Sequence, residues 1–236
     1  MGNPTKESSL EHFKAHHHPH LIAKRLADGP DSVYLKEFIY GAVDGAITTF
    51  AIVAGVAGAG MSAGVIIILG FANLLADGFS MAVSNFLGTR AENQHRVKIR
   101  QMELDEIEKF PEGEAEEVRQ IFALKGFEGQ LLEDAVEVIT SDTEKWVDTM
   151  LQEEHGMSLQ EHDALKAGLA TFGAFCLVGF IPLITYVANW ISPGLIANPF
   201  GWSAAMTGVA FFWVGAVKGK FVSHYWLLSG LETVVV

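Results

Sequence analysis

The chain contains four long apolar segments, and each is long enough to cross a lipid bilayer as a helix. They occupy residues 38–60, 63–87, 167–191 and 196–217. A helix rises about 1.5 Å per residue, so about 20 apolar residues cross a hydrocarbon core of roughly 30 Å. The last two segments lie in a run of 51 residues without Asp, Glu, Lys or Arg, which soluble domains rarely contain. The pattern therefore predicts an integral membrane protein.

A fifth apolar segment covers residues 221–236 and contains Glu232. Its 16 residues would form roughly 24 Å of helix, which is less than a full crossing. We therefore interpret it as a fifth span that is truncated.

Lysine and arginine residues lie at only one end of each of the four long segments. They are Lys24, Arg25 and Lys36 before the first segment, Arg90, Arg96, Lys98 and Arg100 after the second, and Lys218 and Lys220 after the fourth. Positively charged short flanks generally remain on the cytosolic side of a membrane. We therefore expect a cytosolic N-terminus and a C-terminus on the opposite side.

The polar region between the second and third segments, residues 89–162, is here called the insert, and its pattern predicts short helices. The first of them continues the second span and stops at Phe110, because a residue that precedes proline avoids helical geometry. The predicted helices cover residues 89–109, 112–125 and 130–139, and a fourth runs from a capping box at Ser141 to about Gly156. A second capping box, at Ser158, is expected to begin the helix of the third span.

These elements predict an all-α, multi-pass membrane protein with five transmembrane helices and a cytosolic helical insert. The expected regions are a cytosolic N-terminal tail (1–35), a transmembrane hairpin of spans one and two (36–88), an acidic metal-binding domain (89–162), and spans three to five (163–236). Residues 1–20 have no adjoining apolar stretch, so we expect no cleavable signal peptide.

Charge and cysteine content exclude several classes of partner and site. Residues 89–166 hold 20 of the 28 carboxylates against nine Lys and Arg, a local net charge of −11. Nucleic acid requires a basic surface, so this region favours cations instead. Cys176 is the only cysteine, which excludes an intrachain disulfide or a thiolate metal cluster.

Polar residues recur within the first two spans. Asn73, Asp77, Met81 and Asn85 are spaced by four and are predicted to lie in one line, and Thr48 is one turn from Asp44. Asp44 and Met81 lie at similar depths in an antiparallel hairpin, where they could share an ion. A charged Asp near the centre of a span costs about 2.5–3.5 kcal/mol, which favours a functional role. The alternative is that the carboxylates of Asp44 and Asp77 only form hydrogen bonds with neighbouring helices.

The insert carries three pairs of candidate metal ligands at helical spacing. They are Glu103 with Glu106, Glu114 with Glu117, and Met150 with Glu154. Carboxylates with a softer thioether suit Fe(II) or Mn(II), whereas oxygen ligands alone would equally suit Ca²⁺ or Mg²⁺. Solvated acidic helix faces are the alternative interpretation.

Two further patterns allow more than one interpretation. His16, His17, His18 and His20 form a tract that could bind metal or have no specific role. Gly41 and Gly45 bracket Asp44 in a close-packing pattern, which either a dimer interface or an ion path would use.

Three stretches resemble the vacuolar iron transporter family. They are Tyr40-Gly-Ala-Val-Asp-Gly45, Ala72-Asn-Leu-Leu-Ala-Asp-Gly-Phe-Ser-Met81 and Ser229-Gly-Leu-Glu-Thr233, and the likeness runs from about residue 35 to the end. The resemblance implies a homodimer, built through spans one and two, that exchanges cytosolic Fe(II), and often Mn(II), for protons. Zn(II) or Co(II) would fit the same sites, and the membrane would be vacuolar or a bacterial inner membrane.

The resemblance also implies which residues bind metal. Asp44 and Met81 match the family's transmembrane ligands, and Glu103, Glu106, Glu114, Glu117, Met150 and Glu154 match its cytosolic ligands. Asn85 departs from the pattern, because many members have an acidic residue there. This difference bears on whether transport is coupled to protons.

An exporter is the function that we expect, with two alternatives from other classes. A di-iron carboxylate oxidase would also place glutamates on facing helices, but its usual Glu-x-x-His pair is absent. His155 directly follows Glu154, so we expect it not to share a helix face with that ligand. The other alternative is a metal sensor that does not transport, which the intramembrane Asp44, Asp77 and Met81 argue against. We therefore expect no enzyme activity.

Overall fold

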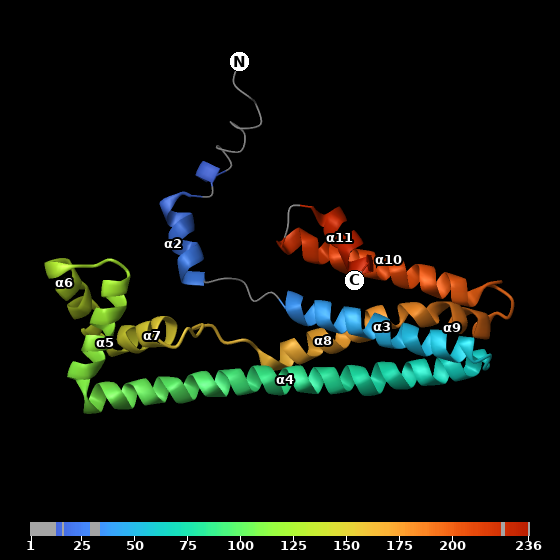
Figure 1. Ribbon diagram of the computed structural model, residues 1–236, viewed down its shortest axis with the longest axis horizontal. Helices are drawn as coiled ribbons and strands as arrows, with labels where there is room; N and C mark the ends of the chain where they lie inside the picture. Colours follow the sequence, from blue (N-terminus) through green and yellow to red (C-terminus); the bar gives the residue numbers. More distant parts are fainter. Residues whose placement is uncertain (1–12, 16, 29–33, 223–224, 236) are drawn as a thin grey trace, which may run out of the picture. The chain divides into compact units, whose positions relative to one another are not determined.

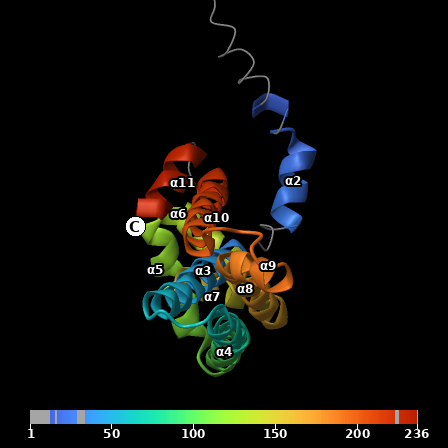
Figure 2. The ribbon, with the colours of Figure 1, turned by 90° about the vertical axis from the view of Figure 1, so that its right-hand side faces the viewer.

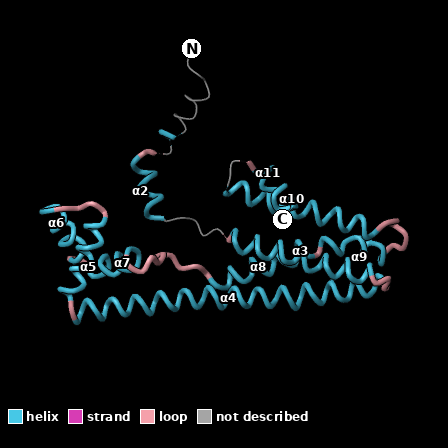
Figure 3. The backbone as a smooth tube through the Cα atoms, in the orientation of Figure 1, coloured by secondary structure: helices cyan, strands magenta, loops and turns pink. Residues whose placement is uncertain are grey.

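The structure, a computed structural model, describes residues 13–15, 17–28, 34–222 and 225–235. Every regular element in these ranges is helical, as the all-α prediction requires (Figure 3). The chain divides into two units, Met1–Val33 and Tyr34–Val236. In the first unit, helix α2 spans Pro19–Asp28, and the fixed φ of Pro19 suits the first position of a helix.

Four helices of the second unit are long and apolar enough to cross a membrane. They are α3 (Leu35–Gly58), the apolar part of α4 (Ala63–Lys109), α8 (Ala164–Gly179) continued by η1 (Ile181–Leu183) and α9 (Ile184–Ile191), and α10 (Pro199–Val222). The fifth segment forms α11 (Trp226–Val235), whose ten residues make about 15 Å of helix. Four of the predicted spans therefore form helices long enough to cross a membrane, and the fifth segment forms a short apolar helix.

Helix α8 packs against both α3 and α4, more extensively than these two pack against each other. Figure 2 shows α3 between α4 on one side and α10 with α11 on the other, and Figure 1 agrees. The apolar core of this bundle contains Val53, Ile66, Leu74, Phe175 and Leu183. The first two spans are therefore not an isolated hairpin, because α8 covers one side of both.

Gly41 and Gly45 allow the close approach of α3 to α8. A Cβ atom on Gly41 would lie 2.3 Å from the carbonyl oxygen of Thr171, and one on Gly45 would lie 2.4 Å from that of Phe175. Both glycines therefore face α8 of the same chain. Contact within the subunit therefore uses the close-packing pattern of Gly41 and Gly45, and its use in a dimer interface or an ion path stays a prediction.

The third span is interrupted, although the sequence predicted one continuous helix. Helix α8 ends at Gly179, and Pro182 lies in the 3₁₀ turn before α9. Proline has no N–H group and its ring collides with the carbonyl four residues earlier, so the regular helix cannot continue. The hydroxyl of Ser203 in α10 donates a hydrogen bond of 2.7 Å to the Pro182 carbonyl. This bond joins the interruption to the fourth span.

Helix α4 contains 47 residues and carries the second span into the insert, as predicted. At about 1.5 Å per residue it is roughly 70 Å long. It ends before Phe110, and α5 (Pro111–Leu124), α6 (Gly129–Thr140) and α7 (Thr143–Glu153) follow. Val118, Val136, Trp146 and Met150 form the apolar core of these short helices.

Two arginines of α4 form ion pairs with the rest of the insert. Arg100 forms ion pairs with Glu144 and with Asp148 of α7, the second at 2.7 Å. Arg96 pairs with Glu161 at 2.8 Å. Helix α7 and the segment that follows it are therefore held alongside α4.

Both predicted capping boxes were placed too early in the chain. Helix α7 is capped by Asp142 rather than Ser141, since the Asp142 carboxylate accepts hydrogen bonds from the N–H groups of Glu144 and Lys145. Residues 158–163 are not helical, and α8 begins only after Asp163, which caps it in the same way. In each case an aspartate nearer to the following helix supplies the acceptor that a serine was expected to provide.

Replacing Gly45 with alanine should destabilise the bundle. The new methyl group would overlap the backbone of Phe175, and overpacking of this kind costs about 1–3 kcal/mol. Thermal unfolding of the purified protein in detergent would measure the change. The matched control is Gly55→Ala on the same helix, where nothing lies within 4 Å of the new Cβ and helix propensity favours alanine. Equal melting temperatures for the two variants would contradict the proposed role of Gly45.

Candidate metal sites

Acidic side chains of the insert gather where α4, α5 and the turn after α7 meet. The ligand atoms of Glu103, Glu106 and Glu114 lie within 4.8 Å of one another, and so do those of Glu103, Glu154 and His155. Glu103 belongs to both groups, so these residues form one cluster, here called the insert cluster. Helix α4 supplies Glu103 and Glu106, α5 supplies Glu114, and the turn after α7 supplies Glu154 and His155.

The local sequence explains how α5 returns to α4. Phe110 leaves helical geometry, with φ −144° and ψ 62°, immediately before Pro111. A Cβ atom on Gly113 would lie 2.3 Å from the Phe110 ring, so only glycine leaves room for this side chain. The chain turns sharply here, so that α5 stands across the end of α4 (Figure 1) and Glu114 lies near Glu103 and Glu106.

Two carboxylates of the insert cluster are buried. Glu103 is 1% exposed and Glu114 is 7% exposed. The Oε2 atom of each is buried with no hydrogen-bond partner among the described residues. Because burying an unpaired polar oxygen costs free energy, a bound cation would stabilise both side chains.

The electrostatic environment of the cluster favours protonated glutamates when no cation is present. The pKa of Glu114 is raised from 4.5 to about 7, first by burial and then by the negative charges of Glu117 and Glu103. Burial also raises the pKa of Glu103, despite the hydrogen bond from His155. The pKa of Glu117 is raised by burial and by the charges of Glu154, Glu103 and Glu106. The charges of the predicted ligands therefore repel one another.

Glu117 and Met150 are predicted ligands that occupy different surroundings. Glu117 is exposed on α5 and its charge interacts with those of the cluster. Met150 is fully buried and packs in the apolar core of the insert with Val118, Val136 and Trp146. The thioether is thus held in the core, one turn before Glu154, and metal binding by its sulfur stays a prediction.

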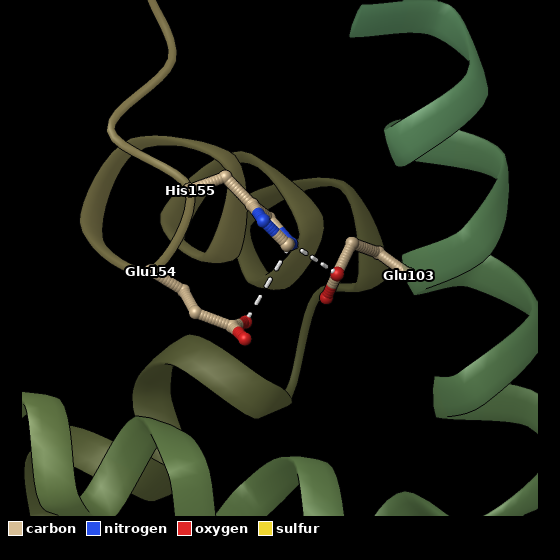
Figure 4. Close-up of side chains that lie close together, drawn as sticks. All are labelled: Glu103, Glu154 and His155. Atoms are coloured by element: carbon tan, nitrogen blue, oxygen red, sulfur yellow. Dashed lines mark hydrogen bonds and ion pairs between the residues drawn. The ribbon is translucent and has the colours of Figure 1, made fainter. Parts of the chain in front are cut away.

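His155 belongs to the cluster, although the sequence analysis placed it away from Glu154. Its Nε2 atom lies 2.7 Å from Glu103 Oε1 and 3.7 Å from Glu154 Oε2, and Figure 4 shows all three side chains converging. Helix α7 ends at Glu153, so His155 lies beyond the helix and the spacing rule for helix faces does not apply to it. Gly156, with φ +63°, lets the chain turn there. The glycine after Glu154-His155 was the sequence signal that could have revealed this.

In the membrane bundle, hydrogen bonds connect the predicted pathway residues of α3 and α4. The Asn73 amide donates to the hydroxyls of Thr48 and Thr49, at 3.0 and 3.3 Å. The Thr48 hydroxyl in turn donates to the Asp44 carbonyl at 2.9 Å. Asp77 lies close enough to Asp44 for their charges to interact. Asp44, Thr48, Asn73 and Asp77 therefore meet at one junction of two helices.

Met81 and Asn85 make other contacts within the bundle. Met81 is partly buried and packs against the apolar core that contains Leu74 and Phe175, and its pairing with Asp44 stays a prediction. The Asn85 amide donates to the Thr171 hydroxyl of α8 at 2.7 Å. Each four-residue step turns about 40° around a helix, so Asn85 lies about 120° from Asn73. The expectation of one straight polar line was therefore wrong at Asn85.

The remaining sequence signals have local structural explanations. The Nδ1 atom of His17 hydrogen-bonds the Phe13 carbonyl, and the rings of His18 and His20 stack 5.8 Å apart. His16 lies outside the described residues, and a metal-binding role of the tract stays a prediction. In the C-terminal stretch, Ser229 and Gly230 pack against α10, where a Cβ on Gly215 would lie 2.6 Å from the Ser229 carbonyl.

The metal-free protein should lose stability as the pH rises from about 5 to 8. The folded state holds the Glu114 proton up to a pKa of about 7, whereas the unfolded chain releases it near 4.5. The stabilisation is therefore complete below the lower value and is lost as the pH passes the higher one. Thermal unfolding in detergent with a chelator should show a melting temperature that falls with pH, and Glu114→Gln should reduce this slope.

The matched control for that measurement is Glu108→Gln, which removes an exposed carboxylate from α4. Its pH slope should equal that of the unmodified protein. If Glu114→Gln also retains the full slope, the raised pKa of Glu114 is wrong.

Comparisons with known proteins agree with these features. A model described as the VIT family matches residues 35–236. A vacuolar iron transporter of Plasmodium berghei (strain Anka) is 31% identical to this chain over 97% of it and 87% of the relative. Vacuolar iron transporter 1 of Arabidopsis thaliana is 29% identical over 98% and 86%. That of Plasmodium falciparum (isolate 3D7) is 34% identical over 85% and 78%. The chain is therefore a membrane protein that belongs to the VIT family, whose members compared here are named as transporters rather than enzymes.

Proposed function

We propose that this protein exports Fe(II), and also Mn(II), from the cytosol in exchange for protons. The family and its named relatives support transport of a metal ion, with iron as the substrate. The observation that carries the proposal further is the pair of unpartnered, buried oxygens on Glu103 and Glu114. Such oxygens are suited to a cation that arrives from solvent and leaves again.

The insert captures the ion. Carboxylates of Glu103, Glu106, Glu114, Glu117 and Glu154 provide oxygen ligands, and the thioether of Met150 adds a softer donor. Fe(II) and Mn(II) suit this set, and Zn(II) or Co(II) would occupy the same sites. Because the negative charges repel one another without a cation, binding relieves this repulsion as well as forming new bonds.

The residues at the junction of α3 and α4 carry the ion across the membrane. Asp44 and Met81 hold it, and Thr48, Asn73 and Asp77 line the route. One unbroken helix, α4, joins the two regions, with about 39 Å of helix between Asp77 and Glu103. A carboxylate binds either a metal ion or a proton, so protons from the far side displace the ion.

The protein works as a homodimer in which the first two spans of each subunit meet. Positively charged flanks keep the N-terminus and the insert in the cytosol, and α11 is part of a truncated fifth span. The membrane is that of a vacuole or a bacterial inner membrane. In this arrangement the ion enters from the cytosolic insert and leaves on the opposite side.

Replacing Asp44 with alanine should abolish transport while leaving ion capture intact. The change removes a membrane carboxylate and leaves the insert cluster untouched. Anaerobic uptake of Fe(II) into proteoliposomes under an imposed pH gradient should fall to the level of empty vesicles, and binding of Fe(II) at the insert of the detergent-solubilised protein should remain unchanged. Ser84→Ala, at an exposed position on α4, is the control. Uptake that survives in Asp44→Ala would defeat the assignment.

Replacing Glu103, Glu106, Glu114 and Glu117 together with glutamine should weaken capture. We expect the Fe(II) concentration that gives half-maximal uptake to rise about tenfold or more, with a smaller change in the maximal rate. The control replaces four exposed carboxylates of the insert instead: Glu108, Glu112, Glu116 and Glu128. If both variants shift the concentration equally, only the overall charge matters and the cluster is not a capture site.

A further inference from the structure

We propose that His155 is a metal ligand of the insert and makes capture selective for transition metals over Mg²⁺ and Ca²⁺. The proposal rests on the proposed capture function and names the substrate class of that site. It concerns the part of the insert cluster formed by His155, Glu103 and Glu154, here called the histidine subsite.

The donor atoms of this subsite already converge. His155 Nε2 lies 2.7 Å from Glu103 Oε1 and 3.7 Å from Glu154 Oε2, and Figure 4 shows the two carboxylates pointing toward the imidazole ring. Metal–nitrogen and metal–oxygen bonds are about 2.0–2.2 Å long, which separates ligand atoms of a tetrahedral site by about 3.4 Å. One pair is close to that separation, and the other needs to open by less than about 1 Å.

Burial provides an independent indication of a ligand. The second oxygen of Glu103, Oε2, is buried and has no hydrogen-bond partner among the described residues, although His155 occupies Oε1. The Glu103 side chain is only 2% exposed, so water reaches it poorly. A cation beside Glu103 would neutralise this oxygen, and the imidazole is positioned to bind the same cation.

The backbone holds the ring toward α4. The N–H groups of Glu154 and His155 both donate to the Met150 carbonyl, at 3.0 and 3.2 Å. Met157 donates to the Leu151 carbonyl at 2.8 Å, and Gly156 lies between them with φ +63°. This turn fixes His155 at the end of α7, so the subsite needs little rearrangement to bind.

The chemistry of imidazole explains the selectivity. Mg²⁺ and Ca²⁺ take oxygen ligands almost exclusively, whereas a neutral imidazole nitrogen binds Fe(II), Zn(II) and related ions well. A cluster of carboxylates alone would also capture Mg²⁺, which competes for oxygen sites. One nitrogen donor next to the most buried carboxylate therefore favours the transition metal.

The test compares ion affinities of the full-length protein in detergent. Competition with a chelating indicator would give dissociation constants for Fe(II), Zn(II), Mg²⁺ and Ca²⁺ in the unmodified protein and in His155→Gln. We expect Fe(II) and Zn(II) to bind about 10–100-fold more weakly in the variant, with Mg²⁺ and Ca²⁺ changed by less than about twofold. His95→Gln, an exposed position on α4, should leave all four values unchanged.

A spectroscopic measurement separates a ligand from a merely structural residue. With one equivalent of Mn(II), pulsed electron paramagnetic resonance should detect a directly bound ¹⁴N nucleus, in a background where His16, His17, His18 and His20 are replaced with glutamine. His155→Gln should remove this signal. Its absence from the background protein itself would overturn the proposal even if His155→Gln failed to fold.

The outcomes also distinguish this inference from the proposed function. Equal weakening of all four ions in His155→Gln would show a structural role and overturn the selectivity, while ion capture would stand. If the unmodified protein bound no Fe(II) at the insert, both the capture function and the histidine subsite would be wrong.

Discussion

The mutual repulsion of buried carboxylates is the constraint on which the insert depends. Glu103 and Glu114 are almost fully buried, and the charges of Glu106, Glu117 and Glu154 act on them. A stable fold without a cation requires protons on some of these groups, and the pKa of about 7 for Glu114 expresses this. A bound cation would remove this repulsion, which supports the proposed capture of a metal ion by the insert.

Helix α4 connects the insert cluster to the membrane bundle. It carries Asn73 and Asp77 at the junction with α3, and Glu103 and Glu106 in the insert. A continuous helix transmits position because its backbone hydrogen bonds resist bending. Tight packing of Gly41 and Gly45 on α8 holds α3 in place at the same time. The proposed capture and passage of the ion would thus use parts of one connected scaffold.

Sequence spacing predicted which side chains converge on regular helices better than which side chains converge at helix ends. Glu103 with Glu106 converged with Glu114 as expected, because spacing of three places side chains on one face. His155 was excluded by the same reasoning, which no longer holds beyond the end of α7. The cap positions at Asp142 and Asp163 were missed for a related reason, since several residues near a helix end can accept the same hydrogen bonds.

By itself, the sequence determined the helical membrane character, the long continuation of the second span and the acidic insert, because hydropathy and helical period are local properties. The tertiary structure decided which faces meet. It placed Gly41 and Gly45 against α8, turned Asn85 toward Thr171, and brought His155 to Glu103 across 52 positions of sequence. These contacts depend on the packing of several helices and on turns such as that at Gly156, which the spacing of residues along one helix does not specify.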